Sequence, residues 1–198
     1  MRCVPSVAFL LLGSTLLLAT ASPSLADMSV GTNFGFAIHN PENGGENTTL
    51  IGVPSQAGLL GTVRPGLRIG GAGSKRDHEG YVDLSYDGIS SNGSGAHALR
   101  IGVNYQYNFN SSATHPYLTF GGGMYNYGGG GDGDNISATS TTIGGGVGLG
   151  VPVSENHGRF RVEVRLDHLS EGKDGGDVLI GAANVFQFTM GFDLWMKN

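Results

Sequence analysis

Hydrophobic and polar residues alternate with a period of two along much of this chain, most clearly at residues 159–167, which read R-F-R-V-E-V-R-L-D. Every second residue of this segment is charged, and the residues between them are apolar. Such alternation is typical of a β-strand, because successive side chains of a strand point to opposite faces of the sheet. The segment therefore predicts a strand with one ionic face and one hydrophobic face.

The same pattern predicts eight strands in all. Seven of them are expected at 28–38, 62–72, 79–89, 96–109, 116–127, 139–153 and 159–167, and the eighth ends at Trp195. Polar or glycine-rich segments separate the strands. Longer segments (39–61, 90–95, 128–137, 169–177) alternate with tighter ones (73–78, 110–115, 154–158). Long loops at one end and short turns at the other are typical of up-and-down membrane barrels.

The first 26 residues do not alternate and are predicted to be a cleavable secretory signal peptide. Arg2 precedes a leucine-rich apolar run at 7–21, and the small residues Ser24 and Ala26 stand at −3 and −1 of a cleavage point before Asp27. The run is short for a spanning helix, which would be needed for the alternative, an N-terminal membrane anchor. The predicted organisation is a signal peptide at 1–26 and one exported domain at 27–198.

Alternation alone fits two environments, a soluble barrel with its ionic face in water or a membrane barrel with its hydrophobic face in lipid. A face exposed to water is usually rich in lysine. After the signal peptide the chain holds only Lys75, Lys173 and Lys197, all outside the predicted strands. The polar side of 139–153 is formed by glycines, which suits a narrow interior that also houses arginines. The membrane barrel is favoured, and a soluble secreted ligand-binding barrel is the alternative.

Opposite charges recur on the predicted inner face. An eight-stranded barrel is only wide enough for its own side chains, so charges inside it must form pairs. Arg161 and Arg165 are expected to pair with Asp193 or with acids of 79–89, because 139–153 offers only glycine. The predicted lumen charge network comprises Arg64, Arg68, Glu79, Asp83, Asp87, Arg100, Arg161, Glu163, Arg165 and Asp193. Aromatic residues near strand ends are predicted to form interfacial girdles, namely Phe109, Tyr117, Tyr127 and Trp195.

Over residues 27–198 the chain resembles the small eight-stranded outer-membrane β-barrel superfamily of OmpA/OmpX type. The resemblance is carried by V-N-Y-Q-Y-N-F at 103–109, by H-P-Y at 115–117 leading into three glycines, and by 162–167. It implies an all-β, antiparallel, up-and-down transmembrane barrel in a Gram-negative-type outer membrane. Segment 186–195 is similar to the aromatic signal that the barrel-insertion machinery reads. Expected partners are therefore outer-membrane lipid, that machinery and an extracellular ligand bound through the loops.

The role expected from these patterns is structural or surface-interacting, without catalysis and without a cofactor. The formal net charge is −5, and there is no clustered basic surface to bind nucleic acid. The glycines of 144–150 alternate within a predicted strand and lack the strand–helix context of a dinucleotide loop. A single G-G-D-G-D-N at 130–135 is better explained as a solvated loop than as a calcium repeat, and the six histidines lack metal-ligand spacing.

One short motif supports an enzymatic alternative. By parity, His168 and Ser170 continue the lipid-facing side of the strand before them. A histidine can activate a serine hydroxyl when a carboxylate orients it, and Glu171, Asp174 and Asp177 follow in the predicted loop. The motif resembles outer-membrane lipid A deacylases, small barrels with a lipid-facing His-x-Ser pair, although its flanking residues depart from their longer motif. This resemblance implies a lipid A acyl-ester hydrolase as the alternative function.

Overall fold

The computed structural model describes residues 27–41, 60–73, 75–91, 94–110, 113–129, 136–153, 157–174 and 177–197. The predicted signal peptide, most of the loop 39–61 and most of the loop 128–137 lie outside the described residues, and so does the calcium-repeat-like segment 130–135. Among the described residues, no helix is long and apolar enough to cross a membrane.

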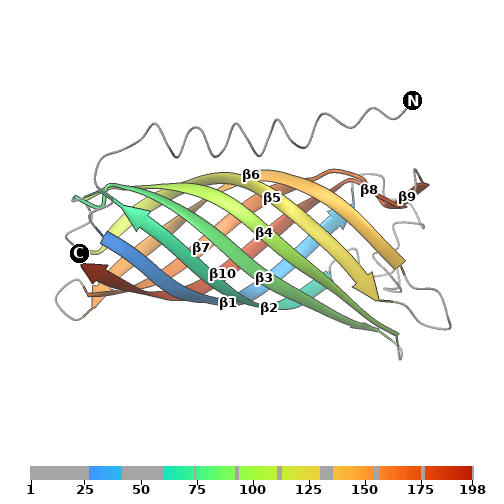
Figure 1. Ribbon diagram of the computed structural model, residues 1–198, viewed down its shortest axis with the longest axis horizontal. Coiled ribbons are helices and arrows are strands. Elements are labelled where there is room, and N and C mark those ends of the chain that lie inside the picture. The colour runs from blue at the N-terminus through green and yellow to red at the C-terminus, as the bar shows by residue number, and fades with distance from the viewer. Residues whose placement is uncertain are drawn as a thin grey trace.

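Eight long strands form a closed barrel (Figure 1). They are β1 (Asp27–Pro41), β2 (Leu60–Ala72), β3 (His78–Ser91), β4 (Ser94–Asn108), β5 (His115–Gly129), β6 (Ile136–Val153), β7 (Gly158–Leu169) and β10 (Ala183–Lys197). Each strand is antiparallel to its neighbours, and pairing of β1 with β10 closes the sheet. Closure gives every strand a partner on both sides, as a sheet in lipid requires. The predicted fold class, an eight-stranded antiparallel barrel, is confirmed.

Two short strands were not predicted. β8 (Gly172–Asp174) lies within the predicted polar loop 169–177, and it pairs with β9 (Asp177–Ile180), which begins at the last residue of that loop. β6 has 18 residues and β7 only 12, so β6 continues past the end of β7. This projecting part of β6 pairs with β8 at Thr139 and Lys173. The hairpin lies at the end of the barrel opposite to the end where β1 begins and β10 finishes (Figure 1).

The two faces of the barrel wall differ sharply in character. Hydrophobic side chains cover the outside, where Leu166 and Val147 are each 57% exposed and Phe120 is 59% exposed. Charged side chains fill the inside, where Asp167 and Asp193 have no exposed surface. This arrangement inverts that of a soluble barrel, and it is stable only where the surrounding solvent is lipid.

The predicted aromatic girdle is only partly correct. Phe109 lies on the outer surface and contacts the Tyr107 ring edge-on at 4.9 Å between ring centroids. Tyr117, Tyr127 and Trp195, in contrast, are buried inside the barrel. The reason is the period of two, since each of these three has the parity of the inward-facing residues of its strand.

The glycines of 144–150 belong to β6 and lie between two antiparallel strands, so they do not form a nucleotide-binding loop between a strand and a helix. A Cβ atom added to Gly146 would lie 2.6 Å from the carbonyl oxygen of Val164 and 3.0 Å from Cβ of Arg165. A Cβ on Gly148 would meet the Tyr117 ring. These glycines therefore make room for large side chains inside the narrow barrel.

Candidate functional site

The first cluster of interior charges is centred on Asp193 of β10. Its carboxylate accepts hydrogen bonds from Arg161, with Nε at 2.6 Å and Nη2 at 2.9 Å, and from Nη2 of Arg159 at 2.8 Å. Arg159 also pairs with Glu79, which accepts a further bond from Arg68 at 2.9 Å. These residues come from β2, β3, β7 and β10, so their charges pair across the lumen as well as between neighbouring strands.

A second cluster lies on β3, β4, β7 and β10. Asp83 accepts hydrogen bonds from Arg100 and Asn104. Asp167 accepts one hydrogen bond from Nε of Arg165 and one from Nε2 of Gln187, each at 2.6 Å. Arg100 links the two carboxylates, because its Nη2 lies 3.6 Å from Asp167.

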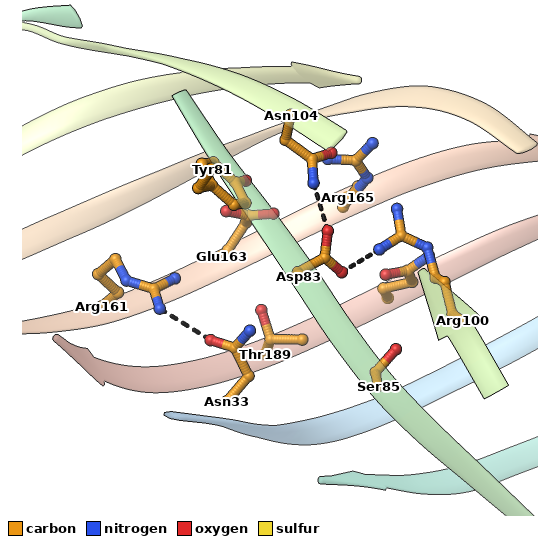
Figure 2. Close-up of a pocket in the computed structure, with 11 residues that line it drawn as sticks. Asn33, Tyr81, Asp83, Ser85, Arg100, Asn104, Arg161, Glu163, Arg165 and Thr189 are labelled. Atoms are coloured by element: carbon orange, nitrogen blue, oxygen red, sulfur yellow. Dashed lines mark hydrogen bonds and ion pairs between the residues drawn. The ribbon is translucent and has the colours of Figure 1, made fainter. Parts of the chain in front are cut away.

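Between the clusters lies a cavity of about 30 Å³, which is room for about one water molecule. Figure 2 shows Asp83 with its partners Arg100 and Asn104, and Arg161 donating to Asn33. Glu163 also lines this cavity, and its Oε1 accepts a hydrogen bond from the Thr119 hydroxyl at 3.5 Å. The described interior is therefore filled by its own side chains around a small polar cavity.

The structure places nine of the ten predicted network residues inside the barrel, all of them buried. The tenth, Arg64, has a side chain outside the described part of the molecule. Arg165 differs from expectation, because the carboxylate that its Nε contacts is that of Asp167, on its own strand. Residues two apart on a strand share a face, and a long arginine side chain can fold back along it. Arg159 and Asp167 have the same parity, which is the signal that could have added them to the network.

His168 and Ser170 lie on the opposite, outer side of the wall. His168 is exposed near the end of β7, between Ile143 of β6 and Asn184 of β10 in the strand register. Leu169, between them in sequence, is fully buried on the inner side. Ser170 follows directly after β7 and is half-buried. The pair therefore faces outward where the hydrophobic wall gives way to the loops.

Ser170 is held by one residue of β6. Its N–H donates to the carbonyl oxygen of Thr141 at 2.9 Å. Its Oγ accepts a hydrogen bond from the Thr141 N–H at 3.0 Å and lies 3.0 Å from Thr141 Oγ1. Its hydroxyl also donates to the Glu171 carbonyl oxygen at 3.4 Å. Sequence spacing could not reveal the contact with Thr141, because the two residues are 29 positions apart.

Of the three candidate carboxylates, the structure describes the side chain of Glu171 alone. Glu171 is exposed and pairs with Lys173 at 3.3 Å, and the side chains of Asp174 and Asp177 lie outside the described part of the chain. The residue directly opposite His168 in the register is an amide, Asn184. Among the described residues, no group of three or more histidine, cysteine or acidic side chains could hold a metal ion.

Comparison with known proteins gives a family match and several structural likenesses. The model of the family described as lipid A 3-O-deacylase (PagL) matches residues 61–173. No curated protein matches the chain significantly. Neisserial surface protein A superimposes with a TM-score of 0.65 at 14% identity, over 84% of this chain and 96% of that one. The attachment invasion locus protein Ail of Yersinia pestis gives 0.52 at 12% identity, over 86% and 98%.

These likenesses bear on the fold alone, because the identities are low. The chain has the eight-stranded barrel architecture of these outer-membrane proteins, as the sequence predicted. The range matched by the family model contains Thr141, His168 and Ser170.

Proposed function

Because more than half of the chain matches its model, the chain belongs to the lipid A 3-O-deacylase (PagL) family, and we propose that it hydrolyses an acyl ester of lipid A. His168 is the general base and Ser170 the nucleophile. The observation that carries this proposal is the outward position of both residues at the same end of the barrel wall. A non-catalytic role was the first expectation from sequence, and the family match favours the enzymatic alternative.

The position of the pair suits an ester of a membrane lipid. Leu166, two residues before His168 on the same face, is 57% exposed and would meet acyl chains. Ser170 and the exposed Lys173–Glu171 pair mark the start of the polar loops. The ester groups of lipid A lie between its acyl chains and its sugar headgroup. They are therefore expected at the level in the membrane where the outer face of the barrel changes from apolar to polar.

The proposed chemistry needs only groups that the chain supplies, together with water. His168 accepts the Ser170 proton while Oγ attacks the ester carbonyl carbon. The tetrahedral intermediate then collapses, the bond between the acyl carbon and the sugar oxygen breaks, and His168 returns the proton to that oxygen, which leaves as a hydroxyl. Water, activated by the same histidine, hydrolyses the acyl-serine and releases the fatty acid. We assign the orientation of the imidazole to Asn184, which lies opposite His168 in the strand register, because an amide fills this role in Cys-His-Asn proteases.

The test is hydrolysis of purified lipopolysaccharide by the folded protein in detergent, with released 3-hydroxy fatty acid measured by mass spectrometry. Ser170→Ala and His168→Ala should reduce release to background. Ser137→Ala and His97→Ala are matched controls, because both residues are exposed on the barrel strands β6 and β4. Heat-modifiable gel migration shows that each variant is folded. A folded wild-type protein that releases no fatty acid from lipid A would refute the proposal.

A second candidate function is a structural or surface-interacting role without catalysis. The observation in its favour is Asn184, because the register puts an amide beside His168 where the best-known triads have a carboxylate. A non-catalytic role predicts that neither wild-type protein nor Ser170→Ala releases fatty acid from lipid A, and that the substitution leaves the gel migration of the protein unchanged. The same assay therefore separates the two functions.

A further inference from the structure

We propose that Thr141 of β6 is a positioning residue for Ser170. Thr141 donates hydrogen bonds to Ser170 Oγ, so that the serine proton remains for transfer to His168. This inference rests on the proposed ester hydrolysis and extends it to a residue outside the His-x-Ser motif. Thr141 comes from a different strand, 29 residues earlier in the chain. It is an exposed residue of the outer face, close to Ser170.

The backbone geometry at the end of β7 singles out this contact. The ladder between β6 and β7 ends with Thr142 opposite Leu169. One position further, the Ser170 N–H still donates to the Thr141 carbonyl at 2.9 Å, as in a regular antiparallel pair. The reciprocal bond is different, because the Thr141 N–H donates to the Ser170 side-chain oxygen at 3.0 Å. The serine hydroxyl thus takes the place of a backbone carbonyl.

The threonine side chain adds a second contact to the same oxygen. Thr141 Oγ1 lies 3.0 Å from Ser170 Oγ, and either hydroxyl can donate. A serine oxygen has two acceptor lone pairs and one proton. When Thr141 donates both its N–H and its hydroxyl, both lone pairs are occupied. The serine proton, which the resting hydroxyl donates to the Glu171 carbonyl oxygen over 3.4 Å, is then the proton left to pass to the imidazole of His168.

This arrangement becomes stronger as the reaction proceeds. When the proton leaves for His168, the electron pair that it leaves behind attacks the ester carbonyl carbon. Negative charge grows on Oγ at that moment, and hydrogen bonds to a charged acceptor are about twice as strong as neutral ones. Thr141 would therefore favour the activated serine over the resting serine, which is the condition for raising kcat.

The experiment compares Thr141→Val, Thr141→Ala and Thr141→Ser in the full-length protein, folded in detergent micelles. Valine keeps the shape of threonine and the backbone N–H but lacks the hydroxyl. Alanine provides a smaller replacement if valine impairs folding. Thr139→Val is the matched control, because Thr139 is exposed on the same strand but is paired with Lys173. Heat-modifiable gel migration reports folding for every variant.

Two readouts are used, kcat and KM on lipid A and the rate at which a fluorophosphonate reagent labels Ser170. Thr141→Val should lower kcat and the labelling rate about tenfold, the equivalent of one hydrogen bond, with little change in KM. Thr141→Ser should restore both rates, and Thr139→Val should leave them unchanged. A contact that only caps the strand would lower stability without this split between kcat and KM.

The outcomes separate the two proposals. The role of Thr141 would be overturned, and the proposed function kept, if folded Thr141→Val and Thr141→Ala retained full kcat and full labelling while Ser170→Ala still abolished hydrolysis. An equal loss of kcat in Thr139→Val would overturn it as well. Wild-type protein without Ser170-dependent hydrolysis would overturn the proposed function, and the role of Thr141 with it.

Discussion

Replacing Asp193 with asparagine tests whether the interior of the barrel depends on paired charges. The substitution keeps the size of the side chain and removes its negative charge. Asp193 has no exposed surface and accepts bonds from two guanidinium groups, those of Arg159 and Arg161. We expect Asp193→Asn to lower the free energy of unfolding substantially.

The magnitude follows from what each arginine retains. Arg159 keeps its pair with Glu79. Arg161 keeps the neutral side-chain oxygen of Asn33 at 2.8 Å. The cost is therefore that of about one buried guanidinium without its counter-charge, ~3–5 kcal/mol. That is a large part of the total stability of ~5–15 kcal/mol that is usual for a folded domain.

Urea unfolding in lipid bilayers measures this cost. The single tryptophan of the chain, Trp195, is buried, and the Arg159 guanidinium lies 5.2 Å from its ring centroid. Its fluorescence therefore reports the region of the substitution, and heat-modifiable gel migration gives a second reading. Glu171→Gln is the control, because its ion pair with Lys173 is 51% and 55% exposed. Such an exposed pair should contribute less than about 1 kcal/mol.

A double-mutant cycle identifies the source of the loss. Combined with Arg161→Met, Asp193→Asn should cost less than the sum of the two single changes, with a coupling of ~0.5–3 kcal/mol. The reasoning is refuted if Asp193→Asn costs no more than Glu171→Gln and the coupling with Arg161 is zero. Water would then reach these charges, and the interior would be an open, hydrated pore.

Four further predictions follow from the same geometry. Val164→Arg puts a charge on the lipid-facing side of β7 and should cost ~2–4 kcal/mol in urea unfolding; a neutral result would mean that the faces are reversed. Gly146→Leu should reduce the folded fraction on heat-modifiable gels, because a Cβ there would lie 2.6 Å from the Val164 carbonyl oxygen. Asn184→Asp should raise kcat for lipid A hydrolysis by placing a carboxylate opposite His168; unchanged kcat would argue against an orienting role. N-terminal sequencing of the exported protein should begin at Asp27, and an uncleaved chain would favour the membrane anchor.

The sequence alone determined the eight long strands of the barrel and their two faces. Alternation with a period of two identifies the inner and outer residues of each strand without knowledge of its neighbours, because successive side chains of any strand point to opposite sides. The same parity placed His168 and Ser170 outside and Glu163 inside. It also holds for Trp195, which the girdle prediction placed outside although its parity matches that of Asp193.

Tertiary structure decided which inner charges meet and what surrounds the outer pair. Glu79 and Arg159 are 80 residues apart, on strands that are not neighbours, and they meet only because the closed barrel is narrow. Arg165 pairs with Asp167 because the conformation of a long side chain, which no pattern specifies, decides among several acids of the same face. Strand register brings Thr141 and Asn184 next to the His-x-Ser motif. Ser170 contacts Thr141 only because β6 extends beyond the end of β7. Parity is a local property of the chain, whereas register and closure depend on all the strands at once.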